Sequence, residues 1–177
     1  GRALGLSGKD GNLVIARKVA MTQTDPKTGE KVAVDLGFVG EPDTVNPEVL
    51  HSIMKSETIP VIAPIGAGRK GETYNINADT VAGAVSCALK AERLIMLTDV
   101  DGVKDLSGAL ISEIRRPDIA GLIEDGTVSG GMIPKLETCT TAVEGGVDAA
   151  VILDGRVPHV TLLEIFTRGG AGTLVRK

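Results

Sequence analysis

The stretch TYNINAD, residues 73–79, places three polar side chains where a loop leads into an apolar helix. Asn75, Asn77 and Asp79 alternate, so an extended backbone would direct all three to one side. Amide and carboxylate groups arranged in this way can bind a polar substrate or orient lysine ammonium groups. Asn77 or Asp79 could instead cap the helix, which would explain one of the three residues but not the set.

A second candidate is SGGMIPK, residues 129–135, in which two glycines open a predicted helix and Lys135 follows about one turn later. Backbone N–H groups beside glycines and the positive end of a helix dipole favour a bound phosphate, toward which the ammonium group could reach. A solvated lysine on a helix surface is the alternative interpretation. The chain has no Gly-Lys-Ser or Gly-Lys-Thr, so the site would differ from a P-loop.

The third candidate is TDVDGVK, residues 98–104, an acidic loop with a glycine that follows a buried apolar run. Asp99, Asp101 and Lys104 could take part with the other glycine-rich loops in holding a polyphosphate compound. An Asp-Gly turn after a strand is common, so this segment indicates a ligand only in combination with the other two.

The elements that must position these residues alternate along the chain from residue 58. Apolar runs at residues 58–66 and 94–98, and in VDAAVILDG and GTLVRK, predict strands, and the segments between them predict helices, the first at residues 79–92. The order β-α-β-α-α-β-α-β with short links is typical of a parallel sheet. We therefore predict an α/β fold, a three-layer αβα sandwich with a mainly parallel sheet, whose ligands bind beyond the carboxyl ends of the strands.

The segment before this alternation has a different pattern. Residues 12–20 and 31–39 flank the turn TDPKTGE, which predicts an antiparallel hairpin near the N-terminus. Asn46 and Pro47 then suit the cap and the first position of a helix.

The bulk composition excludes several classes of function. Hydrophobic residues make up 42% of the chain and aromatic residues 2%, so the core must be built from aliphatic side chains. The net charge of −4, without a basic run, gives no indication of nucleic-acid binding. No apolar stretch reaches the roughly 18 residues that span a bilayer. Cys87 and Cys139 have no partners spaced for a metal site, and we expect free thiols in a cytoplasmic protein.

Four segments taken together, TYNINADTVAGA, LIMLTDVDGV, DGTVSGGMIPK and FTRGGAGTLV, resemble the N-acetylglutamate kinases of the amino-acid kinase family in order and spacing. The resemblance implies ATP-dependent phosphorylation of the γ-carboxylate of N-acetyl-L-glutamate in arginine biosynthesis, with Mg²⁺ carried by the ATP. It also implies that residues 1–177 form the C-terminal nucleotide-binding part of the kinase domain and that the N-terminal substrate-binding part is absent. We expect such a fragment to be inactive by itself.

The resemblance assigns roles to individual residues. Asn75 would bind N-acetylglutamate, Asp79 would organise lysines around the phosphates, and Lys135 would stabilise the phosphoryl group during transfer. The nucleotide-binding residues that it implies are Thr98, Asp99, Val100, Asp101, Gly102, Val103, Lys104, Thr127, Val128, Ser129, Gly131 and Met132.

The last helix and loop, LLEIFTRGGAGT, look like those of family members that are inhibited by L-arginine. The candidates for an allosteric arginine site are Glu164, Gly169, Gly170 and Gly172. The resemblance further implies a homo-oligomer, a dimer or a hexamer, for the complete enzyme.

Three alternatives remain open at this point. The chain could belong to another member of the family, with a different phosphoryl acceptor. It could bind ATP or arginine without catalysing a reaction, or it could be a scaffold used only for assembly. The glycine-rich loops gathered at one edge of the predicted sheet disfavour the scaffold.

Overall fold

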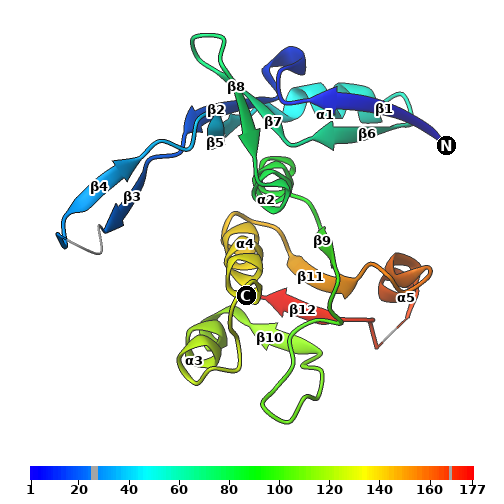
Figure 1. Cartoon of the computed structure of the whole chain (residues 1–177). Helices are drawn as coiled ribbons and strands as arrows, with labels where there is room; N and C mark the ends of the chain where they lie inside the picture. The colour runs from blue at the N-terminus through cyan, green and yellow to red at the C-terminus, as the bar shows by residue number, and fades with distance from the viewer. Residues whose placement is uncertain (25–27, 168) are drawn as a thin grey trace. The chain divides into compact units, whose positions relative to one another are not determined.

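A computed structural model describes residues 1–24, 28–167 and 169–177 of the chain (Figure 1). The chain divides into two compact units, Gly1–Val81 and Ala82–Lys177, and each is considered by itself. Across the residues that the structure describes, no helix is long and apolar enough to cross a membrane.

The first unit contains most of the strands. Its sheets are a parallel pair of β1 with β6, an antiparallel pair of β3 with β4, and a closed four-stranded ring in the order β2-β5-β8-β7. The elements are β1 Arg2–Ser7, the 3-10 helix η1 Asp10–Asn12, β2 Val14–Lys18, β3 Met21–Thr24, β4 Lys31–Val34, β5 Val39–Val45, α1 Pro47–Met54, β6 Thr58–Ala63, β7 Ile65–Gly68 and β8 Thr73–Ile76, and α2 Ala78–Leu89 follows.

The predicted hairpin is present, but it is longer than expected and divided in two. The strands β3 and β4 pair antiparallel, whereas β2 pairs with β5. Gly37, at φ +70°, breaks the second arm, and its N–H donates to the Asp35 carboxylate at 2.8 Å. This left-handed turn separates β4 from β5, so residues 12–20 do not pair with residues 31–39 as one ladder. Residues 25–27 of the predicted turn lie outside the described residues.

The apolar run at residues 58–66 is two strands, and the prediction of one buried strand was wrong. Pro64 lies between β6 and β7, and it has no N–H to contribute to a ladder. Strand β6 pairs with β1, whereas β7 pairs with β2 and β8. Ile59 and Val61 on β6 are more than half exposed. The run therefore leaves one sheet and enters another.

The two helix caps of this part of the chain follow their sequence signals. The Asn46 side chain accepts a hydrogen bond from the N–H of Glu48 at 3.2 Å, with Pro47 at the first helical position of α1. The Asn77 side chain accepts from the N–H of Thr80, also at 3.2 Å, at the start of α2. The glycine-rich segment GAGRKG, residues 66–71, turns between the antiparallel strands β7 and β8, so it does not form the strand-to-helix turn of a dinucleotide fingerprint.

The second unit is a four-stranded sheet in the order β10-β12-β11-β9 with helices packed on it (Figure 1). Strand β11 runs parallel to β9 and antiparallel to β12, and β10 runs parallel to β12. The elements are β9 Arg93–Thr98, β10 Glu113–Arg115, the 3-10 helix η2 Arg116–Asp118, α3 Ile119–Glu124, α4 Met132–Glu144, β11 Ala149–Asp154, α5 Val160–Phe166 and β12 Thr173–Arg176.

The direction of β12 departs from the predicted parallel order. Helix α5 has 7 residues and spans about 10 Å, whereas the 6 residues of β11 span about 20 Å. The helix by itself does not cover the length of β11. Strand β12 begins beside the end of β11, with Thr173 opposite Ile152, and runs back along it.

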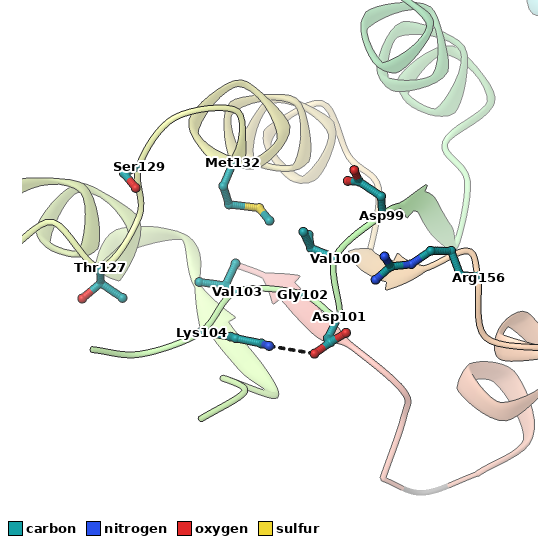
Figure 2. Close-up of a pocket in the computed structure, with 10 residues that line it drawn as sticks. All are labelled: Asp99, Val100, Asp101, Gly102, Val103, Lys104, Thr127, Ser129, Met132 and Arg156. Atoms are coloured by element: carbon teal, nitrogen blue, oxygen red, sulfur yellow. Dashed lines mark ion pairs between the residues drawn. The ribbon is translucent and has the colours of Figure 1, made fainter. Parts of the chain in front are cut away.

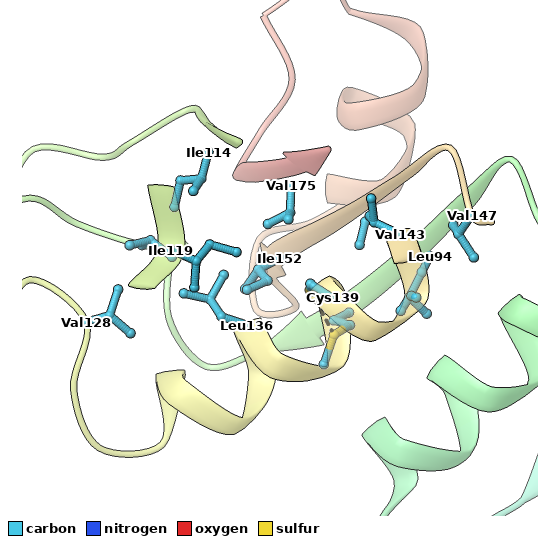
Figure 3. Close-up of a cluster of buried hydrophobic side chains, with 14 residues drawn as sticks. Leu94, Ile114, Ile119, Val128, Leu136, Cys139, Val143, Val147, Ile152 and Val175 are labelled. Atoms are coloured by element: carbon cyan, nitrogen blue, oxygen red, sulfur yellow. Dashed lines mark hydrogen bonds between the residues drawn. The ribbon is translucent and has the colours of Figure 1, made fainter. Parts of the chain in front are cut away.

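The core of the second unit is aliphatic, as the composition predicted (Figure 3). Alternate residues of β11 belong to two clusters. Ala150 and Ile152 pack in the cluster that holds the buried side chains of α4, and Val151 and Leu153 pack in the cluster that holds Val160 of α5. Burial on both sides accounts for the continuous apolar run of this strand.

The junction between α5 and β12 leads to a prediction about stability. A Cβ at Gly172 would collide with the carbonyl oxygen of Ile152 in β11, so the two backbones can pass only with glycine at this position. We expect Gly172→Ala to lower the free energy of unfolding by about 3 kcal/mol, as for severe overpacking. Urea unfolding followed by circular dichroism measures it.

Gly169→Ala is the matched control, because no described atom lies within 4 Å of where its Cβ would be. This variant should stay within about 0.5 kcal/mol of the wild type. Equal stability of the two variants would contradict the proposed collision.

Candidate functional site

A pocket opens beyond the carboxyl ends of β9 and β11, at the edge where the sequence predicted a ligand (Figure 2). These strands pair in a register that sets Thr98 opposite Asp154, so they end together. The cavity has a volume of about 310 Å³, near the lower end of the range for small-molecule sites. The lining residues are Asp99, Val100, Asp101, Gly102, Val103, Lys104, Thr127, Ser129, Met132 and Arg156.

One wall of the pocket is the loop that follows β9. Lys104 and Asp101 form an ion pair at 2.8 Å across Gly102 and Val103. Gly102 has φ +141°, a backbone conformation that favours glycine. Val103 is 2% exposed and anchors the loop in the core. The aspartates that the sequence singled out are thus held at the rim by buried neighbours.

The opposite wall is the turn before α4. The N–H of Thr127 donates to the Asp125 carboxylate at 2.9 Å, which fixes the start of the turn. Met132, the first residue of α4, points across the cavity toward Val100 (Figure 2). Ser129 lies beside it in the lining. Apolar side chains on both walls can hold a flat ring between them, and the carboxylates of the loop can accept hydrogen bonds from hydroxyl or amino groups.

Three residues expected in the nucleotide site lie outside the lining. Val128 is 2% exposed and belongs to the hydrophobic core. Thr98 is the last residue of β9, where its hydroxyl donates to Asp99 at 3.2 Å. Gly131 precedes α4 as its cap residue. All three lie next to lining residues in the chain.

Arg156 lines the pocket and was not among the predicted site residues. Its Nε and Nη2 donate to the two oxygens of the Asp154 carboxylate at 2.9 and 2.8 Å, and its backbone N–H donates to the same group at 2.9 Å. Figure 2 shows the guanidinium directed toward the loop of Asp99 and Asp101. An arginine in a turn usually has a solvated side chain. The one signal in the sequence for a pocket-lining arginine was its place in DGR, directly after a strand end.

The electrostatics of this corner follow from the Asp154–Arg156 pair. Hydrogen bonds from Arg156 lower the pKa of Asp154 from its ordinary value to about 2. Asp154, and more weakly Asp99 and Asp101, raise the pKa of Arg156. Lys104 pairs with Asp101, and Arg156 pairs with Asp154, which lies outside the lining. With Asp154 counted, this corner has one more acidic than basic side chain, which suits the hydroxyl and amino groups of a ligand better than its anionic end.

Lys135 is the fourth residue of α4, at the end of its first turn, and is half-buried. It is not part of the cavity lining. The N–H groups of Met132 and Ile133 donate to Ser129 and Gly130 at 3.2 and 3.3 Å. These two amides of the helix start thus already have acceptors within the turn.

The TYNINAD residues lie in the first unit. Asn75 and Asn77 are exposed, whereas Tyr74 and Ile76 between them are buried, which is the alternation that the sequence indicated. Asn77 caps α2, and Asp79 is half-buried in the first turn of that helix. The cap accounts for Asn77 and leaves Asn75 and Asp79 as candidates for binding.

Glu164 is buried on α5, at 8% exposure, and has a built environment. Its carboxylate accepts the N–H of Ala171 at 2.8 Å and faces Nη1 of Arg93 at 3.5 Å. Gly170, at φ +64°, comes so close that a Cβ would lie 2.7 Å from this carboxylate. A separate cavity nearby is lined by Glu92, Arg93, Ile95, Asp148, Ala149 and Ile165.

Within the described residues, no group of three or more His, Cys, Asp or Glu side chains is arranged to hold a metal ion.

Comparison with known proteins places the chain in a family. The model of the amino acid kinase family matches residues 2–154. The chain belongs to this family. Solved structures agree in fold: the carbamate kinase of Giardia lamblia bound to AMP-PNP has a TM-score of 0.62 at 19% identity, covering 90% of this chain and 52% of that one.

Relatives with a higher sequence identity than the carbamate kinase are acetylglutamate kinases. Those of Parvibaculum lavamentivorans and Novosphingobium aromaticivorans are each 60% identical, over 100% and 99% of this chain. The chain spans 58% and 60% of their lengths. The N-acetylglutamate synthase of Neisseria gonorrhoeae, in complex with coenzyme A and L-arginine, is 25% identical with a TM-score of 0.83, covering 99% of this chain and 38% of that one.

The Asp154–Arg156 pair leads to a prediction about pH. Because the pKa of Asp154 is depressed in the folded state, its contribution to stability is present above the unfolded value of about 3.9 and is lost as the pH falls toward 2. We expect Asp154→Asn to be less stable than the wild type at pH 6, with the difference shrinking below pH 4. Urea unfolding of both proteins at several pH values measures it.

The comparison with Asp154→Asn is needed because other aspartates also have lowered pKa values and titrate in the same range. They are Asp10, Asp35, Asp105 and Asp125. Their contribution cancels in the difference between the two proteins. A difference that stays constant between pH 6 and 2.5 would contradict the depressed pKa of Asp154.

Proposed function

We propose that this chain supplies the nucleotide-binding part of an acetylglutamate kinase, which transfers the γ-phosphoryl group of ATP to the γ-carboxylate of N-acetyl-L-glutamate. The observation that carries the proposal is the 60% identity, over essentially the whole chain, with acetylglutamate kinases. The pocket beyond the carboxyl ends of β9 and β11 supports it. As an enzyme of arginine biosynthesis that uses ATP, the protein would act in the cytoplasm.

The pocket suits the nucleoside end of ATP. Val100, Val103 and Met132 offer apolar contacts for the adenine ring. Asp99 and Asp101 can accept hydrogen bonds from the ribose hydroxyls or the adenine amino group. The phosphates would then extend toward the start of α4 and Lys135.

The chemistry requires positive charge more than proton transfer. A carboxylate is already a competent nucleophile, so the reaction needs no general base, and the difficulty is to bring two anions together. In our proposal Lys135 stabilises the charge on the transferring phosphoryl group, Asp79 orients lysine ammonium groups by hydrogen bonding, and Asn75 binds the acyl amino acid. Mg²⁺ would arrive with the ATP, because it prefers phosphate oxygens and water to an all-protein cage, and it would neutralise phosphate charge.

A second ligand, L-arginine, is favoured by the surroundings of Glu164. The ionised Glu164 carboxylate has about four acceptor positions, of which the N–H of Ala171 and the Arg93 guanidinium use two, so it can accept hydrogen bonds from the guanidinium of a free arginine. The nearby cavity carries two further acidic residues, Glu92 and Asp148. The Neisseria synthase, which is similar in fold, was solved in complex with L-arginine, and this supports arginine as the ligand. We propose that arginine binds beside α5 with Glu164, Gly169, Gly170 and Gly172 as its surroundings.

The kinase assignment is tested by the acyl phosphate, which hydroxylamine traps as a hydroxamate. With ATP, Mg²⁺ and N-acetyl-L-glutamate, we expect the complete polypeptide to form hydroxamate and the 177-residue chain to form none. In the complete polypeptide, Lys135→Ala should lower kcat by about 10²–10³, as for the loss of one charge-stabilising donor. Lys55→Ala is the matched control, since Lys55 is exposed at the end of α1 and should leave the rate unchanged.

A near-wild-type rate for Lys135→Ala would remove that residue from the mechanism. Hydroxamate formed from another carboxylate, but not from N-acetylglutamate, would indicate a different acceptor within the family. ATP binding without transfer by the complete polypeptide would leave the binding-module alternative.

The arginine site is tested by calorimetric titration of the chain with L-arginine. Glu164→Gln keeps an oxygen that can accept the N–H of Ala171 but removes the charge. We expect this variant to weaken arginine binding at least about tenfold, because a charged hydrogen bond is roughly twice as strong as a neutral one. L-Citrulline, which lacks the guanidinium charge, is the matched ligand control, and equal binding of both ligands would contradict the role of Glu164.

A further inference from the structure

The hydroxyl of Thr173 is completely buried at the start of β12 and makes two hydrogen bonds to a single loop. It donates to the carbonyl oxygen of Ile111 at 2.7 Å and accepts the N–H of Val103 at 2.8 Å. Thr173 does not line the nucleotide pocket, but Val103 does. The side chain therefore joins the core of the second unit to a wall of the pocket.

The two partners of Thr173 are the two ends of the loop. Val103 enters it and Ile111 leaves it, and the N–H of Ile111 donates to the Val103 carbonyl oxygen at 2.8 Å. The N–H of Leu174 donates to Ser112 at 2.9 Å, which continues the contact along β12. Backbone bonds thus close the base of the loop, and the Thr173 hydroxyl and the Leu174 N–H attach it to β12.

Gly102 shows how closely the loop lies on this hydroxyl. A Cβ at Gly102 would be 2.6 Å from Oγ1 of Thr173, and the residue has φ +141°. Glycine therefore permits both the backbone conformation and the close approach. Asp101 and Lys104, whose ion pair forms part of the rim, flank the residues that rest on Thr173.

We propose that Thr173 is a positioning residue for nucleotide binding, which holds the backbone of residues 102–103 so that Asp101 and Lys104 face the pocket. This inference rests on the proposed assignment of the pocket to a nucleotide. Without the hydroxyl, the buried N–H of Val103 and the carbonyl of Ile111 lose their partner, and unpaired buried groups are costly. Because residues 104–110 are exposed, the loop can recover hydrogen bonds with water by moving off β12.

Thr173→Val tests this role, because valine has nearly the same shape but can neither donate nor accept a hydrogen bond. We expect the Kd for ADP, measured by calorimetric titration of the chain, to rise about tenfold. Thr173→Ser retains the hydroxyl and should stay within about twofold of the wild type. Val175→Ala, at another completely buried position of β12, should lower stability but leave the Kd unchanged.

Amide hydrogen exchange of Val103, measured without nucleotide, tests the contact by itself. We expect exchange at least about tenfold faster in Thr173→Val than in Val175→Ala, and slow exchange in Thr173→Ser. Equal rates in Thr173→Val and Val175→Ala would overturn the proposal whether or not the chain binds ADP.

The two hypotheses fail in different ways. If the wild-type chain does not bind ADP, the nucleotide assignment and the binding role of Thr173 fall together, while the exchange result still decides whether Thr173 holds the loop. If the wild type binds ADP and Thr173→Val binds it within about twofold, the pocket assignment stands and the positioning role is wrong.

Discussion

The parallel pairing of β9 with β11 is the interaction on which the candidate site depends. It brings the ends of the two strands together, so the acidic loop after one and the Asp-Gly-Arg turn after the other emerge side by side. The N–H of Gly155 donates to Thr98 at 2.8 Å and extends the pairing by one residue. Since β11 is buried along almost its whole length, the rim of the pocket is anchored in the core of the second unit.

The position of the pocket could be predicted from the sequence because it follows from strand direction alone. Apolar runs located β9 and β11, and the carboxyl ends of parallel strands meet at one edge of a sheet. The loop of Asp99–Asp101 and the turn before α4 were therefore expected at a common site, and the structure brings them together. Arg156 could not be found in this way, because its role depends on the carboxylate of Asp154 that directs its side chain. The roles of Asn75, Asp79 and Lys135 stay predictions.

The fold could be predicted where the local pattern decides it. The prediction failed where a single residue or the direction of a strand decides it. Caps and aliphatic strands follow from residue type, and the structure has both at Asn46 and in β11. The division of residues 58–66 depends on Pro64, which an apolar run conceals. The reversal of β12 could not be predicted, because a pattern of alternating elements reports the order of the strands and not their direction.

Three consecutive residues after the last helix each make a contact with a different part of the second unit. Ala171 binds the carboxylate of Glu164, Gly172 passes against the backbone of Ile152, and Thr173 binds the loop of Val103. Adjacent Cα atoms are about 3.8 Å apart across planar peptide units, so a segment of three residues that is held at each one has little freedom to change its length. The C-terminal helix and that wall of the cavity are therefore connected by a segment that is held at each of its three residues.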